Sequence, residues 1–223
     1  MTDSKYHTDA WNNPCMPTPR ADESTEIEAR RPIAAAIVFI VTGVLGWYAA
    51  FALIIDKIKL LENPEADLDC NFSILVQCGA NLDSWQGAVF FGVPNPVWGL
   101  GGFVAPIAVG VALLAGARFA RWFWIAFAVG VTGALAFCIW LMSQSFFSLG
   151  TLCPWCMLVW SVTILLFWTT WLHILSHGHL PVPERTRRVF TTLYHWIPAI
   201  TVASYLIVAL VAQLAVDWLM YVL

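Results

Sequence analysis

A long stretch without charged side chains constrains this 223-residue chain more than any other feature. No Asp, Glu, Lys or Arg occurs between Arg121 and Glu184. A helix needs about 20 apolar residues to cross a bilayer, so this stretch has room for two crossings and a short turn. Because open backbone cannot face lipid, we expect each crossing to be an α-helix.

The composition excludes most classes of soluble protein. Charged residues make up only 11% of the chain and hydrophobic residues 60%, whereas an ordinary soluble domain is about 25% charged. The mean hydropathy is +0.73. A formal net charge of −3 without a basic stripe argues against a nucleic-acid partner. We therefore expect an integral membrane protein.

Five uncharged runs are expected to be transmembrane helices, which makes the predicted fold class all-α. A four-helix bundle and a fifth helix would be formed by residues 32–55, 96–117, 122–142, 153–175 and 197 to near the C-terminus. We place the turn between the third and fourth helices at residues 143–152, because polar residues and Gly150 cluster there.

The basic residues predict the orientation of these helices. Arginines cluster before the first span, between the second and third, and between the fourth and fifth: Arg30, Arg31, Arg118, Arg121, Arg185, Arg187 and Arg188. With five spans, all three sites lie on one side, which the positive-inside rule assigns to the cytoplasm. The N-terminus would then be cytoplasmic, and the C-terminus and the acidic loop 56–95 extracytoplasmic.

The chain divides into three predicted parts. Residues 1–31 are polar and contain several prolines, so we expect a disordered cytoplasmic tail rather than a signal peptide. Residues 32–196 would form the four-helix core with its outer loop 56–95. Residues 197–223 would form the fifth helix, with lateral support of the bundle as its expected role.

The predicted orientation also sorts the six cysteines. Cys15 would lie in the reducing cytoplasm, and Cys138 inside the third span, where a free cysteine usually acts as a small apolar residue. The four on the oxidising side are Cys70, Cys78, Cys153 and Cys156. We expect chemistry only from these four.

The segment Cys153-Pro154-Trp155-Cys156 is a C-x-x-C motif at the outer end of the fourth span. One helical turn brings both sulfurs together, and a helix N-terminus stabilises a thiolate. Proline suits the first turn of a helix. These features favour a redox-active pair, with half of a metal site or a static disulfide as alternatives. We expect no metal.

Cys70 and Cys78 are separated by seven residues of the outer loop and can pair if the loop turns back. Such a bridge alone is often only structural. Two outward-facing pairs beside a membrane helix suggest thiol–disulfide exchange between them. The loop pair would meet a soluble partner, and the helix pair a lipid-soluble electron carrier.

Two further groups of residues receive structural interpretations. His173, His177 and His179 are expected to form a solvated interfacial group rather than a metal site. Small residues in or near the spans are expected to serve helix packing. These are Gly43, Gly46, Gly99, Gly101 and Gly102.

In the order and spacing of these residues, the chain resembles the bacterial branch of the vitamin K epoxide reductase family. The resemblance covers about residues 33–175. It rests on Cys70, Cys78, Ser84, the segment Pro94-Asn95-Pro96-Val97-Trp98-Gly99 and the motif Cys153-Pro154-Trp155-Cys156. It implies a four-helix bundle around a quinone, either menaquinone or ubiquinone, covered by the loop that carries Cys70 and Cys78.

The resemblance also implies an order of electron transfer. A reduced partner would attack the Cys70–Cys78 bond at Cys70, and the freed Cys78 would attack Cys153. The freed Cys156 would then reduce the quinone. Asn95 would donate a hydrogen bond to a quinone oxygen and stabilise the charge that develops there.

Two other positions bear on the quinone pocket. Ser84 matches a family serine near the quinone head group. Trp160 stands where the vertebrate enzymes have a tyrosine, and Leu82 replaces a phenylalanine. An indole can only donate a hydrogen bond, whereas a hydroxyl can also accept one. Trp160 would still line the pocket, but these changes favour quinone reduction over epoxide reduction.

Many bacterial members carry a fused thioredoxin-like domain after the last span, and none follows here before Leu223. The resemblance therefore implies a separate DsbA-like thioredoxin-fold partner, together with the membrane quinone pool. Since DsbA has a potential near about −120 mV, its reoxidation needs a more positive acceptor such as a quinone. We expect a thiol oxidoreductase that supports disulfide formation, in the inner (plasma) membrane, with an extracytoplasmic active site.

Three alternatives are kept beside this interpretation. The same fold could act as a vitamin K epoxide or quinone reductase proper. A non-catalytic membrane protein could use both disulfides only to brace its outer loop. A metal transporter is disfavoured, because the first four spans contain almost no ionisable groups to line a path.

Overall fold

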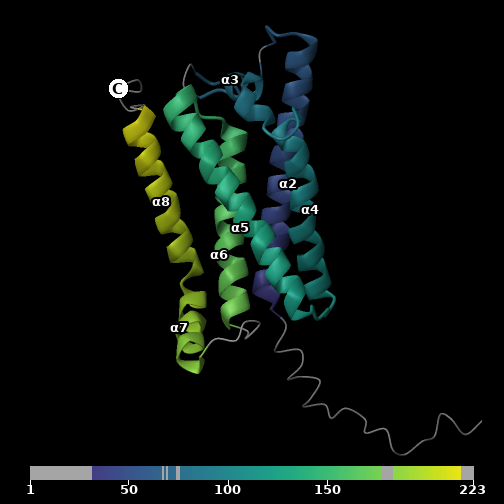
Figure 1. The fold of residues 1–223 in the computed structure, drawn as a ribbon, viewed down its shortest axis with the longest axis vertical. Coiled ribbons are helices and arrows are strands. Elements are labelled where there is room, and N and C mark those ends of the chain that lie inside the picture. Colours follow the sequence, from purple (N-terminus) through teal and green to yellow (C-terminus); the bar gives the residue numbers. More distant parts are fainter. Residues whose placement is uncertain (1–31, 67, 69, 74–75, 177–182, 217–223) are drawn as a thin grey trace, which may run out of the picture. The chain divides into compact units, whose positions relative to one another are not determined.

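The computed structural model describes residues 32–66, 68, 70–73, 76–176 and 183–216. Within these residues, five helices are long and apolar enough to cross a membrane, and no β-strand occurs. They are α2 (Ile33–Glu62), α4 (Asn95–Leu114), α5 (Arg121–Gln144), α6 (Pro154–Ser176) and α8 (Ile197–Val216). This confirms the predicted all-α membrane fold (Figure 1). The orientation across the membrane stays a prediction.

Helices α2 and α4 pack closely because glycines face the partner helix. A Cβ atom added at Gly110 would lie 2.7 Å from the Ala36 carbonyl oxygen, and one at Gly43 would lie 2.6 Å from the Ile107 side chain. The packing role expected for Gly101 and Gly102 is wrong, because among the described residues a Cβ atom there would meet no neighbouring helix within 4 Å. Glycine spacing alone does not show which face of a helix meets a neighbour.

Helix α6 contacts α2, α5 and α8, and its last turns lie in an aromatic core. The His173 ring lies 4.9 Å from the Trp124 ring and 6.5 Å from the Phe39 ring, measured between centroids. His173 is therefore buried, and its expected place in a solvated group is wrong. His177 and His179 lie outside the described residues.

Helix α2 ends at Glu62, about two turns beyond the predicted end at residue 55. Uncharged runs mark the part of a helix that fits hydrocarbon, not the point where its hydrogen bonding stops. The outer loop is accordingly shorter than the predicted 56–95. It contains two short helices, α3 (Gly79–Asp83) and η1 (Trp85–Ala88).

The predicted turn at residues 143–152 is mostly helical. Helix α5 runs to Gln144 and continues as the π-helical segment η2 (Ser145–Leu149). The Ser143 hydroxyl donates a hydrogen bond to the Trp140 carbonyl at 2.6 Å, so this polar side chain is compatible with a helix. The helical path ends at Gly150, whose φ of 62° is the left-handed conformation that glycine tolerates.

Helix α7 (Glu184–His195) precedes α8 and was not anticipated, because its charged residues hide it from a search for uncharged runs. Helix α8 lies beside α6 (Figure 1). The Tyr205 hydroxyl donates to the Ser161 carbonyl at 2.7 Å, and the Trp168 indole N–H donates to the Ser204 hydroxyl at 3.1 Å. The predicted tail, residues 1–31 with Cys15, lies outside the described residues.

Candidate active site

A polar scaffold holds the outer loop against the segment before α6. The Asn81 side chain donates to the Thr151 hydroxyl at 3.0 Å and accepts from the Ser145 hydroxyl at 3.2 Å. The Gln77 backbone N–H donates to the Leu152 carbonyl at 2.9 Å. Residues 77 and 152 directly precede Cys78 and Cys153, so this bond fixes the two cysteines side by side.

Cys70 and Cys78 form a disulfide, with their Cα atoms 5.9 Å apart. The loop between them turns back because the Cys78 backbone N–H donates to the side-chain oxygen of Asn71 at 3.0 Å. Both cysteines are buried: Cys70 is 3% exposed and Cys78 is fully enclosed. The loop pair is therefore closed and shielded from solvent in this conformation.

Cys153 and Cys156 are both free thiols at the start of α6. The Cys153 Sγ lies 3.3 Å from the Cys78 Sγ, so Cys78 is bonded to Cys70 and in contact with Cys153. A thiolate at Cys153 would be placed to attack this disulfide at Cys78. The structure thus brings together all four cysteines that the sequence singled out.

The environment of Cys153 favours its thiolate. The Cys156 thiol donates a hydrogen bond that lowers the pKa of Cys153, and the Cys156 backbone N–H, 3.4 Å from the Cys153 Sγ, acts in the same direction. Burial and the charge of Asp56 oppose this effect, but the net pKa of Cys153 is below the usual value. Since the thiolate is both the nucleophile and the good leaving group, Cys153 is suited to disulfide exchange.

Cys156 lines two adjoining hollows that share Asn95 and Trp160. The smaller, of about 70 Å³, also contacts polar residues of the outer loop: Asn81, Ser84 and Gln86. The larger is an apolar cleft of about 600 Å³, lined mainly by α4, α5 and α6. Sites for small organic ligands are typically about 300–1,000 Å³, apolar, and equipped with a few polar groups. The residues present therefore fit a quinone, with an apolar cleft for its hydrocarbon parts.

The predicted quinone-contacting residues all line these hollows. The Asn95 side chain donates to the Gln86 carbonyl at 2.6 Å and accepts from the Val89 backbone N–H at 3.1 Å. An amide group has two N–H donors, so one is left to reach a ligand. The Ser84 hydroxyl donates to the Asn81 carbonyl at 2.8 Å. Trp160 is buried with its ring edge-to-face against Phe146. Their roles toward a ligand stay predictions.

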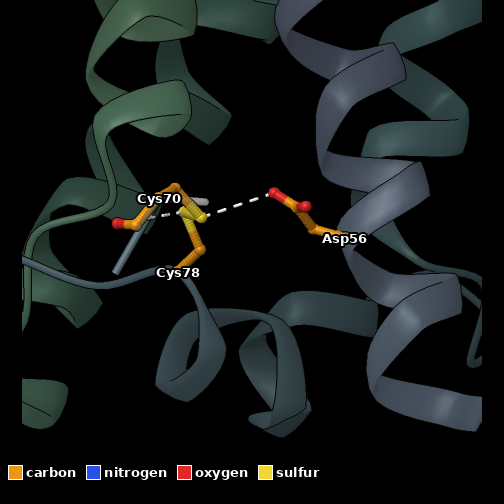
Figure 2. A group of neighbouring side chains, drawn as sticks. All are labelled: Asp56, Cys70 and Cys78. Atoms are coloured by element: carbon orange, nitrogen blue, oxygen red, sulfur yellow. Dashed lines mark hydrogen bonds between the residues drawn. A yellow bond between two sulfur atoms is a disulfide. The ribbon is translucent and has the colours of Figure 1, made fainter. Parts of the chain in front are cut away.

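One residue of the site was missed. Asp56 is 5% exposed, and its carboxylate lies 3.3 Å from the Cys70 Sγ (Figure 2). The predicted loop 56–95 includes Asp56 only as one of its acidic residues. A signal was present, because Ala49, Leu53 and Asp56 follow helical spacing on the buried face of α2.

Comparison with known families agrees with the geometry. The model of the vitamin K epoxide reductase family matches residues 37–171, whereas no curated protein matches the chain. The match covers more than half of the sequence and includes the four cysteines, Ser84, Asn95 and Trp160. This family consists of membrane oxidoreductases that use quinones. The chain, with its five apolar helices, is a multi-pass member of the vitamin K epoxide reductase family.

Proposed function

We propose that the protein is a quinone-dependent thiol oxidase of the plasma membrane. Its donor would be a separate DsbA-like thioredoxin-fold protein on the extracytoplasmic side, which it keeps oxidised for disulfide formation. The observation that carries this proposal is the 3.3 Å separation between the Cys153 Sγ and the Cys78 Sγ, with Cys78 bonded to Cys70. Two cysteine pairs whose sulfurs lie this close can exchange a disulfide directly.

The exchange is written as four substitutions at sulfur. The partner's thiolate attacks Cys70, and the electron pair of the Cys70–Cys78 bond passes to Cys78. Cys78 attacks Cys153 in its oxidised bond to Cys156, which leaves as a thiolate. The partner's second thiol then attacks the partner's own sulfur in this mixed disulfide and forms the partner's disulfide. Its proton passes to Cys70, which is released as a thiol.

In the last substitution, Cys70 attacks Cys78 and releases Cys153. The loop pair is then closed and the helix pair is a dithiol. The structure has this combination, with a Cys70–Cys78 bond and free Cys153 and Cys156. In the proposed relay, the same combination of bonds follows the fourth substitution.

Cys156 is the cysteine placed to pass these electrons on. It lines both hollows, whereas Cys153 is fully buried. A quinone bound there would supply a two-electron, two-proton acceptor, with Asn95 and Trp160 as the residues to hold it. At the other end of the relay, Cys70 is enclosed, so attack by the partner requires its segment to shift.

A purely structural role for the two pairs is less well supported. Disulfides that only brace a loop have no need to touch another cysteine pair. They also have no need for one thiol of that pair to line a ligand-sized cleft. Both features are required if electrons pass from the loop to a lipid-soluble acceptor.

The test is reconstitution of the purified protein in lipid with a reduced thioredoxin-fold oxidase and either ubiquinone or menaquinone. We expect quinol to form at a rate that depends on both the protein and the reduced partner, followed by quinone absorbance. Reactions without the partner or without the protein are the controls. Quinol formation no faster than in these controls, with each quinone, would contradict the proposal.

A further inference from the structure

A buried carboxylate lies at the entrance of the proposed relay. Figure 2 shows Asp56 pointing from α2 toward the Cys70–Cys78 disulfide. A carboxylate oxygen lies 3.3 Å from the Cys70 Sγ. Burying a carboxylate is costly unless other groups compensate its charge. The Lys59 ammonium lies 3.9 Å from the other carboxylate oxygen and helps to stabilise that charge.

The contact between Asp56 and Cys70 changes its nature with the redox state. A disulfide sulfur carries no hydrogen, so the closed pair offers the carboxylate no donor. Once Cys70 is reduced, its thiol can donate to Asp56 across the same distance. A thiol must also lose its proton before it can attack a disulfide, because the thiolate is the nucleophile.

We propose that Asp56 is a catalytic base that removes the proton from the Cys70 thiol when Cys70 recloses its bond to Cys78. This inference rests on the proposed function. In the step, Cys70 attacks Cys78 within the Cys78–Cys153 mixed disulfide, and the Cys70–Cys78 bond forms. The Cys78–Cys153 bond breaks, its electron pair goes to Cys153, and the Cys70 proton goes to the Asp56 carboxylate.

The geometry places each participant beside the next. Cys70 lies 3.3 Å from the Asp56 oxygen, is bonded to Cys78, and Cys78 lies 3.3 Å from Cys153. The lowered pKa of Cys153 supports its departure as a thiolate. The carboxylate is therefore on the side of the attacking sulfur, and the stabilised thiolate on the side of the leaving sulfur.

Other ionisable groups near Asp56 must be considered for any pH dependence. On α2 they are Lys59, beside Asp56, and Lys57, which pairs with Asp83 of the α3 segment at 3.4 Å. Near the start of α6 they are the thiols of Cys153, which directly precedes the helix, and of Cys156; α4 contains no charged residue. Asp83 is a matched control, because it is a carboxylate of the same region that is largely exposed and does not contact sulfur among the described contacts.

The experiment compares wild type, Asp56→Asn, Asp56→Glu and Asp83→Asn in the reconstituted system. Samples are quenched in acid during turnover, alkylated, digested and analysed by mass spectrometry for the Cys78–Cys153 disulfide. We expect Asp56→Asn to accumulate this mixed disulfide and to lose turnover at least tenfold. Wild type and Asp83→Asn should neither accumulate the mixed disulfide nor lose turnover. Asp56→Glu should recover part of the turnover rate.

A pH profile separates proton transfer from a structural effect. Without the base, Cys70 must lose its proton to water. The turnover rate of Asp56→Asn should therefore approach the wild-type rate as the pH rises toward the ordinary thiol pKa of about 8.5. A constant deficit at all pH values without mixed disulfide would overturn the inference. Wild-type turnover in Asp56→Asn would also overturn it and leave the relay standing. No turnover in wild type would instead defeat the proposed function and this inference with it.

Discussion

The two ends of the bundle formed by α2, α4, α5 and α6 use similar helices in different ways. One end is filled by interlocking aromatic rings, among them Phe39, Trp124 and His173. The other end holds four cysteines and a buried carboxylate, and there Cys156 and Asn95 line a ligand-sized cleft that also reaches Phe127, Val131 and Leu166 beside the aromatic core. The aromatic end can be called the packed end, and the cysteine end the reactive end.

The difference shows how stability and reactivity are divided within one bundle. At the packed end, contact among large rings such as Phe39 and Trp124, which do not line the cleft, stabilises the helices. At the reactive end, a hydrogen bond accepted by the Asn71 side chain and one donated by the Asn81 side chain position the loop without filling the space beside Cys156. Changes at the reactive end should therefore affect turnover, and changes at the packed end should affect stability.

The largest expected effect is loss of either helix-pair cysteine. Cys153→Ala and Cys156→Ala should each abolish quinol formation while the protein still inserts, because each breaks the path between Cys78 and the cleft. Cys138→Ala is the matched control, since Cys138 is also a free thiol that lines the cleft. Normal partner oxidation in both helix-pair variants, measured in the reconstituted system, would refute the division between the two ends.

Substitutions at the packed end should lower the free energy of unfolding. Trp124 is 2% exposed inside the aromatic core, so Trp124→Ala should lower the unfolding free energy by about 3 kcal/mol. Turnover per folded molecule should stay unchanged. Trp122→Ala is the control, because Trp122 is 71% exposed and should tolerate the change. Equal loss of stability in both variants, measured by thermal unfolding in detergent, would show that the core is not where the structure places it.

An intermediate effect is expected at the boundary between the outer loop and the cleft. Asn95→Ala should slow quinone turnover about tenfold, as expected for the loss of a hydrogen bond of about 1.4 kcal/mol. The KM for the reduced partner should not change, since Asn95 lines the cleft and not the surroundings of Cys70. An unchanged rate would show that Asn95 does not contribute to quinone turnover. A raised KM for the partner would show that Asn95 positions the outer loop instead.

The smallest effect concerns the fifth helix. Tyr205→Phe removes the hydroxyl that donates to the Ser161 carbonyl, which should cost about 1 kcal/mol of stability. Turnover should be the same as in wild type, because the bond only attaches α8 to the side of α6. A substantial loss of turnover would show that α8 contributes to the site rather than to lateral support.

Much of the fold and the grouping of the cysteines could be predicted from the sequence. Uncharged runs report bilayer crossings directly, so all five spans were identified. The alternation of basic loops then placed Cys70, Cys78, Cys153 and Cys156 on one side. Any fold consistent with that alternation brings these residues to the same end of the bundle.

The remainder depends on tertiary contacts that periodicity does not report. The charge of Asp56 predicts that the first helix ends before it, yet α2 continues to Glu62 and buries Asp56. The polarity of His173 predicts a place at the membrane interface, but its ring packs against those of Phe39 and Trp124. Polar residues at 143–149 predict a turn, but the Ser143 hydroxyl donates to the Trp140 carbonyl within α5, and the Ser145 hydroxyl donates to the Thr151 carbonyl just beyond the helical segment.

The central claim is direct exchange between the loop pair and the helix pair. It is tested most directly in the double variant Cys70→Ala/Cys156→Ala, which leaves Cys78 and Cys153 as the two remaining sulfurs of the relay. After oxidation in the membrane and digestion without reductant, mass spectrometry should find a peptide pair joined by a Cys78–Cys153 disulfide. Free thiols at both positions, or a bond from Cys153 to another cysteine, would contradict the account.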